Sequence, residues 1–303
     1  MTRITSSKHE TGGISEVAIK KATCSGAMIL LMTLLLAVTA AAEEKGKLYV
    51  VGAGPAGSDL MAPRAQAAVK AADIYLTSPG LPDRFDRFEG IIDPEKVAFD
   101  PWEPFMGSEA RQLKKDDPEA WEAHSKKHRH QIQRFIREQI DKGKTVAMID
   151  GGDPCVYAPS LHRLLKGFDP ELFEVIPGMG AFNAAGAALK TTFTPDDVRF
   201  VMLTSPRSLF GENWEKEDGI LKDLSKYNAT MIWYMSLRSI DQVVLRMKEH
   251  YPPHFPIAIV YYAGYADREK VLRSTLDSVS DDVKQMEEEW LGLFIAGEVA
   301  AGP

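Results

Sequence analysis

A chain of 303 residues is long enough for two domains of ordinary size, or for one domain preceded by a leader. Its 45% hydrophobic residues are typical of a globular protein, and a formal net charge of −7 argues against a general nucleic-acid binder, which needs clustered Lys and Arg. Cys24 and Cys155 are the only cysteines, which excludes a disulfide framework and a cysteine-based metal site.

The first 45 residues have the pattern of a signal peptide. Lys20 and Lys21 precede an apolar run over residues 27–38, and the alanines at 40–42 offer a cleavage site. The run is shorter than the ~20 residues that a spanning helix needs, so membrane association is expected only through an uncleaved leader. The pattern predicts export to the periplasm; a misassigned start codon would instead leave the protein cytoplasmic.

After the leader, short apolar runs alternate with helical patterns, which indicates α/β architecture with mainly parallel sheets covered by helices. A turn containing Pro195 is the predicted boundary between an N-terminal α/β domain over 46–193 and a C-terminal α/β domain over 194–303. The predicted strands are 48–51, 74–77, 145–149 and 173–176 in the first domain, and 199–204, 230–235, 257–262 and 291–299 in the second.

Helices are predicted from the spacing of apolar residues. Residues 126–142 and 239–250 each place apolar side chains on one helical face, and Gly143 is positioned to end the first of these helices. Residues 79–121 contain many Pro, Asp and Glu and have little periodicity. We expect that region to form long surface loops with short helices.

The first predicted strand runs into Gly52-x-Gly54-x-x-Gly57, which has the spacing of a dinucleotide-binding loop. Two features disfavour a nicotinamide or flavin site. The acidic residue expected about 20 positions later is absent, since Thr77 and its neighbour stand there. Pro63 suits the first turn of a helix, so the glycines form a longer loop before that helix.

Two further glycine motifs follow predicted strands. Residues 145–149 lead directly into the Asp-Gly-Gly-Asp-Pro segment at 150–154, at the carboxyl end of a strand, where ligands bind in open α/β sheets. Residues 173–176 lead into Pro177-Gly178 and a helix of small residues, whose first N–H groups can receive an anion. Each motif by itself is also compatible with an ordinary strand-to-helix turn.

Two later segments complete an ordered set of motifs: Trp233-Tyr-Met-Ser236, and residues 256–264 leading into residues 268–276. Together with the three glycine motifs, this set resembles the tetrapyrrole methylase family over residues 48–299. That family consists of S-adenosylmethionine-dependent enzymes that methylate uroporphyrinogen III and the precorrins. Any one motif is a weak signal, whereas five in the same order are a strong one.

The resemblance implies two α/β domains that hold S-adenosyl-L-methionine in a cleft between them, largely through backbone groups and apolar contacts. No metal is required. Met235 and Gly264 would bracket the adenine from the second domain. The cofactor-binding residues implied by position are Pro55, Gly151, Gly152, Asp153, Val156, Gly180, Ala181, Met235 and Gly264.

The implied reaction is methyl transfer to a ring carbon of a small-molecule tetrapyrrole, uroporphyrinogen-like or precorrin-like, in porphyrin or cobalamin biosynthesis, by a homodimer. The carboxylates of such a ring would be recognised by cations, for which Arg207, Arg238 and the run 126–130 are candidates. The run is also typical of a solvated helix face. No catalytic base is assigned, because Thr77 and Ser78 replace the acidic residue of the uroporphyrinogen branch.

Two other functions remain open. Export conflicts with a cofactor and a substrate that are made and used in the cytosol, so one alternative is an exported tetrapyrrole-binding protein that has lost catalysis. That protein would bind the ring without binding the cofactor. The second alternative, an oxidoreductase built on the loop at 52–57, would bind a nicotinamide or flavin instead.

Overall fold

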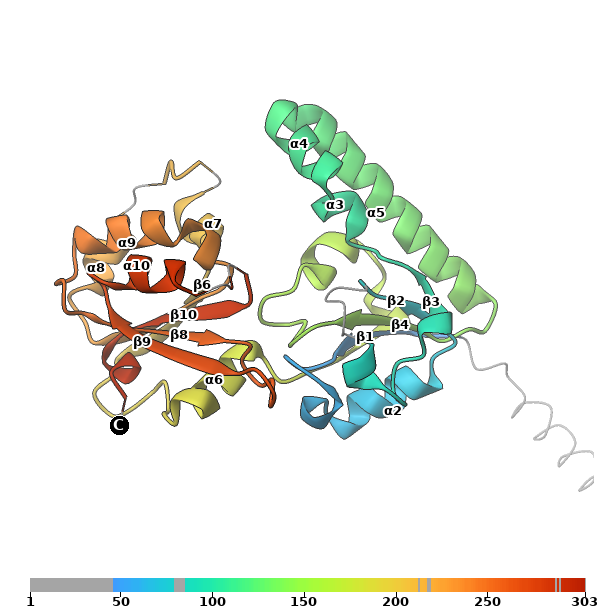
Figure 1. Ribbon diagram of the computed structural model, residues 1–303. Helices are drawn as coiled ribbons and strands as arrows, with labels where there is room; N and C mark the ends of the chain where they lie inside the picture. Colours follow the sequence, from blue (N-terminus) through green and yellow to red (C-terminus); the bar gives the residue numbers. More distant parts are fainter. Residues whose placement is uncertain are drawn as a thin grey trace, which may run out of the picture. The chain divides into compact units, whose positions relative to one another are not determined.

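The computed structural model describes residues 46–78, 85–211, 213–216, 219–286, 288 and 290–302. Within these residues the chain forms two five-stranded sheets, each built from consecutive strands of the sequence (Figure 1). The predicted leader, residues 1–45, lies outside the described residues. None of the helices in the described ranges has the length and apolar content needed to cross a membrane.

The first sheet is parallel throughout, as predicted, and is covered by helices on both faces. Helix α2 (Pro63–Ala71) packs on one face, and α5 (Pro118–Asp141) packs on the other. Ile132, Ile136 and Ile140 recur at helical spacing on the buried side of α5. The strand order is β3-β2-β4-β1-β5, with β1 (Leu48–Gly52), β2 (Ile74–Leu76), β3 (Val97–Phe99), β4 (Val146–Asp150) and β5 (Phe173–Ile176).

Helix α5 starts earlier than the apolar pattern predicts. The Asp117 side chain accepts a hydrogen bond from the Ala120 N–H at 2.9 Å, and Pro118 occupies the first helical position. These local signals begin the helix although its first turns are mostly polar. Gly143, with φ 74°, follows the helix end as predicted.

The region 79–121 contains short elements among its loops, as expected, but it also contributes the edge strand β3. Three residues with partial burial give too short a pattern to predict a strand. The short helices are η2 (Asp86–Phe88), η3 (Pro94–Lys96), α3 (Glu103–Met106) and α4 (Ser108–Asp116).

In the second sheet the expectation of mainly parallel strands is wrong. Only β6 and β7 pair in parallel, and the other neighbours are antiparallel. The loop at 262–269 explains part of this, because a parallel crossover needs a dozen or more residues and so short a loop joins antiparallel strands. The order is β6-β7-β10-β8-β9, with β6 (Phe200–Thr204), β7 (Ala229–Trp233), β8 (Pro256–Tyr261), β9 (Lys270–Thr275) and β10 (Gly292–Ala296).

Helices also cover both faces of the second sheet. Helix α6 (Ala181–Leu189) follows β5 of the first sheet in sequence, yet it packs in one apolar cluster with Val260 and Ile295 of the second sheet. Residues 46–303 form one unit, so the boundary at 193/194 stays a prediction. The opposite face of the sheet packs against α7 (Pro206–Phe210), α8 (Ile220–Leu224), α9 (Ile240–Lys248) and α10 (Val279–Lys284).

Candidate cofactor site

Two of the glycine motifs meet at the carboxyl end of the first sheet. Strands β1 and β4 are neighbours, so the loops that follow them leave the same edge. An isolated β-bridge joins the loops: the Gly152 N–H donates to the Gly54 carbonyl at 2.7 Å, and the Gly54 N–H donates to the Gly152 carbonyl at 3.2 Å. Segments far apart in the sequence thus share one piece of backbone surface.

The third glycine motif packs onto the same bridge. A Cβ atom on Gly178 would lie 2.2 Å from the Gly152 carbonyl oxygen, and a Cβ atom on Gly52 would lie 2.5 Å from the Gly178 amide nitrogen. Atoms do not approach so closely without a backbone shift, so only glycine fits at these two positions. Gly52, Gly54, Gly152 and Gly178 therefore pack through peptide groups instead of side chains, and we call this part of the sheet the glycine edge.

The loop after β4 is held by its own polar side chains. Asp153 Oδ1 accepts a hydrogen bond from the Cys155 N–H at 2.8 Å, which fixes the turn that follows the two glycines. Buried Ser160 donates from its hydroxyl to the buried carboxylate of Asp150, and this bond closes the loop at its base. Val156 lies between these bonds and is 37% exposed. Asp153 thus shapes the loop, while Val156 faces outward.

Two stacked tyrosines connect the loop after β4 with the loop after β7. The ring centroids of Tyr157 and Tyr234 are 4.7 Å apart, and their planes differ by 14°. Burial raises the pKa of Tyr234 to about 12, so this hydroxyl keeps its proton at neutral pH. The stack brings together the sequence neighbours of two predicted residues, Val156 and Met235. Met235 itself has φ 55° and is 44% exposed.

The loop between β8 and β9 contacts the first glycine loop. Gly264 has φ 88°, and a Cβ atom there would lie 2.7 Å from Leu60 Cδ1 and 3.2 Å from Pro55 Cγ. The same position lies 3.3 Å from Ala184 Cβ of α6. The Gly264 N–H donates to Glu269 Oε2 at 2.7 Å, which fixes its orientation. Two predicted residues, Pro55 and Gly264, are therefore direct neighbours.

Of the remaining three predicted residues, Gly151 is exposed and directly follows β4, and the other two begin helix α6. Gly180 is the N-cap and Ala181 is the first helical residue. The Asn183 side chain accepts a hydrogen bond from the Gly180 N–H at 3.1 Å, which stabilises the helix start. Because Gly178 packs on the bridge, this positive end of the helix dipole begins close to the glycine edge.

The cationic candidates lie in other surroundings. The Arg238 guanidinium is 5.3 Å from the Trp290 ring, and Arg207 belongs to α7. The run 126–130 forms part of α5, where the rings of His124 and His128 are 4.3 Å apart and burial lowers the pKa of His128. Among the described residues, no cluster of His, Cys, Asp and Glu is arranged to hold a metal ion.

Thr77 occupies the position at which an acidic residue would follow the second strand. Its side chain is fully buried, and its hydroxyl donates to the Ile149 carbonyl at 3.1 Å. Thr77 therefore joins β2 to β4 and offers no carboxylate to the glycine edge.

The sequence does not single out two side chains that join these loops. Tyr234 lies inside the motif that begins at Trp233, and its position next to Met235 could have marked it as a residue of the site. Arg87 lies in a region without periodicity or a motif, and only the folded chain brings it to Asp267.

Comparisons with known proteins agree with this arrangement. A profile of the family Tetrapyrrole (Corrin/Porphyrin) Methylases matches residues 47–280. The cobalt-precorrin-4 C(11)-methyltransferase of Methanocaldococcus jannaschii is 28% identical over 263 residues, which cover 85% of this chain and 89% of that protein. The uroporphyrinogen-III C-methyltransferase of Priestia megaterium is 26% identical over 264 residues, covering 84% and 98%.

Solved structures share the fold. A cobalt precorrin-4 methyltransferase, described as a cobalamin biosynthetic enzyme, aligns with TM-score 0.65 and 21% identity over 85% of this chain and 97% of its own. The uroporphyrin-III C-methyltransferase of Thermus thermophilus, complexed with S-adenyl homocysteine, aligns with TM-score 0.58 and 20% identity over 84% and 99%.

The prediction of export to the periplasm is wrong. It depended on a local apolar run in residues 1–45, and the relatives found in the comparisons contradict it. The named relatives are methyltransferases, and one of the solved structures is described as a cobalamin biosynthetic enzyme. Such an enzyme must meet its cofactor and its reduced ring substrate in the compartment that makes them, a requirement that a local hydropathy pattern does not contain.

Proposed function

This chain belongs to the tetrapyrrole (corrin/porphyrin) methylase family, and we propose that it methylates a ring carbon of a precorrin with S-adenosylmethionine bound at the glycine edge. The predicted family, α/β fold class and activity as an S-adenosylmethionine-dependent C-methyltransferase are confirmed. The relatives named above are methyltransferases, which gives no support to a binding protein without catalysis or to an oxidoreductase.

The observation that carries the proposed cofactor site is the convergence of Gly52, Gly152 and Gly178 on one another. S-adenosylmethionine has a zwitterionic amino-acid end, a ribose and a flat adenine. The backbone of exposed Gly151 and of half-buried Gly152 and Gly178 suits the polar parts, and the start of α6 suits the carboxylate. The exposed Met235 and Val156 offer apolar contact for the adenine and the remaining carbon atoms. The residues present therefore fit this cofactor.

The bound cofactor supplies a methyl group on a sulfonium sulfur, which leaves as S-adenosylhomocysteine when a ring carbon forms its bond to that methyl carbon. The ring loses one proton in the overall reaction. The chain contributes alignment of the two reactants and exclusion of water, both of which favour a displacement that needs in-line geometry. We further propose a homodimer, by analogy with the family.

Of the two substrates named for the relatives, Thr77 favours the precorrin. The uroporphyrinogen branch is expected to carry an acidic residue after the second strand, whereas the Thr77 hydroxyl is buried and bonded to Ile149. Assays of the full chain with precorrin-4 and with uroporphyrinogen III are expected to give methylation of the first alone. Methylation of uroporphyrinogen III alone would contradict this substrate assignment.

The cofactor site can be tested with two glycine variants that differ mainly in location. Gly152 and Gly167 have φ 77° and 79°, and a Cβ atom on either would meet nothing within 4 Å. Each change to Ala therefore costs about 1 kcal/mol of backbone strain. Calorimetric titration of the full chain with S-adenosylhomocysteine is expected to show about tenfold weaker binding for Gly152→Ala, about 1.4 kcal/mol, and none of this loss for Gly167→Ala.

Two more variants extend the test to side chains. Asp153→Ala removes the turn-fixing acceptor, and Met235→Ala removes an exposed apolar contact, so both are expected to weaken cofactor binding. A folded wild-type chain that binds neither S-adenosylmethionine nor S-adenosylhomocysteine would refute the proposed function. Equal affinities in the Gly152 and Gly167 variants would place the cofactor elsewhere.

A further inference from the structure

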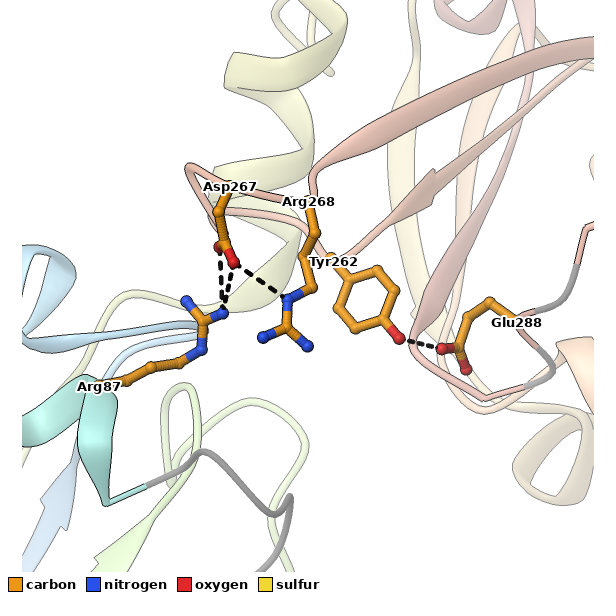
Figure 2. A network of polar contacts seen from close by, with 5 residues as sticks. All are labelled: Arg87, Tyr262, Asp267, Arg268 and Glu288. Atoms are coloured by element: carbon orange, nitrogen blue, oxygen red, sulfur yellow. Dashed lines mark hydrogen bonds and ion pairs between the residues drawn. The ribbon is translucent and has the colours of Figure 1, made fainter.

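Arg87 lies in η2, outside every motif described above, and it contacts two loops at the candidate cofactor site. Its backbone packs on the first glycine loop: a Cβ atom on Gly57 would lie 3.3 Å from the Arg87 carbonyl oxygen. Its side chain reaches the β8–β9 loop, where one terminal nitrogen donates to both carboxylate oxygens of Asp267 at 3.0 and 2.9 Å (Figure 2). Arg87 therefore bridges the two loops.

The contact with the β8–β9 loop is more than a charge pair. The Arg87 guanidinium carbon lies 4.4 Å from the centroid of the Tyr265 ring, so the cation packs on an aromatic face while it binds the carboxylate. The Arg87 side chain is only 18% exposed, whereas that of Asp267 is 59% exposed. A planar guanidinium can make both contacts at once, and a lysine ammonium cannot.

A second arginine reinforces the same loop. Arg268 Nε lies 3.4 Å from an Asp267 carboxylate oxygen, and its guanidinium carbon lies 5.3 Å from the Tyr262 ring centroid. The Tyr262 hydroxyl in turn donates to Glu288, so the loop is tied at that end to the segment that precedes β10 (Figure 2). Arg87 connects this set of residues (Tyr262, Asp267, Arg268 and Glu288) to η2 of the first half of the chain.

The same loop carries Gly264, which lies against Pro55 and Leu60 of the glycine loop. The Gly264 N–H donates to Glu269 Oε2, which ties Gly264 to the segment that carries Asp267. We propose that Arg87 is a positioning residue: it holds the β8–β9 loop on the glycine loop and thereby sets the affinity for the cofactor. The cofactor part of this inference depends on the function proposed above.

The size of the effect follows from the contacts. If the loop must be in place for binding, the apparent affinity equals the intrinsic affinity multiplied by the fraction of molecules in which the loop is in place. Releasing the loop reduces this fraction and therefore the affinity. One partly exposed ion pair and one cation–π contact together correspond to about a tenfold change. The full chain carrying Arg87→Ala is therefore expected to bind S-adenosylhomocysteine about tenfold more weakly in calorimetric titration.

Matched variants separate positioning from general destabilisation. Asp267→Ala removes the ion pair but leaves the Tyr265 contact, so it should weaken binding less than Arg87→Ala does. The double variant should lose little more than Arg87→Ala alone, because the ion pair is already lost in that variant. Arg87→Lys should restore binding only in part. Lys248→Ala is the control, since Lys248 ends α9 in the second sheet's half of the chain and pairs there with Asp277 at 2.8 Å. It should bind as the wild type does.

Hydrogen exchange of residues 262–269 provides a readout that needs no cofactor. Arg87→Ala should speed exchange in this loop, including the Gly264 amide, while Lys248→Ala should not. Unchanged affinity and unchanged exchange in Arg87→Ala would overturn the inference, as would equal losses in the Lys248 control. If the wild type binds no cofactor, the proposed function fails, and the exchange measurement still decides whether Arg87 holds the loop.

Discussion

The two loop regions at the candidate site are built in opposite ways. At the end of the first sheet, Gly52 and Gly178 pack against each other and against Gly152 through backbone atoms, and the contact exists because Gly52 and Gly178 have no side chains. In the β8–β9 loop, the long side chains of Arg87 and Asp267 make the contact. Packed backbone has no rotamers with which to absorb an added atom, whereas side chains do. Substitutions in the first region should therefore lower stability strongly, whereas side chains in the second region can adjust to a substitution.

Gly178→Ala is expected to have the largest effect. The new Cβ would lie 2.2 Å from the Gly152 carbonyl oxygen and 2.8 Å from the Gly52 carbonyl carbon, both of which are backbone atoms. Relieving that overlap must move a strand end, so we expect a loss of about 3 kcal/mol in the free energy of unfolding. Urea denaturation measures this loss, and a near-neutral result would contradict the view of this edge as closely packed backbone.

Gly292→Ala, in the second sheet, sharpens the comparison. Its Cβ would lie 2.6 Å from Leu237 Cδ1, the far end of a side chain that can change rotamer. We expect a loss of about 1 kcal/mol, clearly smaller than for Gly178→Ala. The same urea titration applies, with Leu237→Ala combined with Gly292→Ala as the check. If the double variant recovers none of the overlap cost, side-chain adjustment is not the reason for the difference.

Tyr157→Ala tests the connection between the loops after β4 and β7. Removing one ring of the stack with Tyr234 is expected to lower the free energy of unfolding by about 1 kcal/mol. Tyr157→Phe keeps the ring and should keep most of the stability, because the stack itself needs no hydroxyl. Thermal and urea unfolding of the two variants distinguish them, and equal losses would show that the ring contact is not what stabilises this connection.

The smallest expected effect is electrostatic. Arg87 lowers the pKa of Asp267 from 3.8 to about 2, so the folded protein holds this proton more weakly than the unfolded chain does. The contribution of the Arg87–Asp267 pair to the free energy of unfolding is therefore complete above pH about 4 and is lost as the pH falls toward 2. NMR titration should find that Arg87→Ala raises the pKa of Asp267 toward 3.8. An unchanged pKa would mean that Arg268 and the backbone N–H of Asp267, and not Arg87, lower it.

Much of the fold follows from local pattern. The buried strand β4 is a continuous apolar run, and the isoleucines at 132, 136 and 140 recur at helical spacing, so both elements are readable from the sequence. Strand β3 was not predicted because three residues carry too little pattern. The antiparallel pairing of β10 with its neighbours was not predicted because pairing depends on contacts that are distant in sequence.

The sequence by itself determined the order of the motifs, and with it the family, because glycines after buried strands reveal where backbone must turn or approach another segment. Only the tertiary structure decided what those glycines touch. It placed Gly152 on Gly54 and Gly264 beside Pro55, and it brought Arg87 to Asp267. A glycine in the sequence indicates that another segment packs closely there, but it does not identify that segment. A charged residue in a loop without periodicity likewise does not identify its partner.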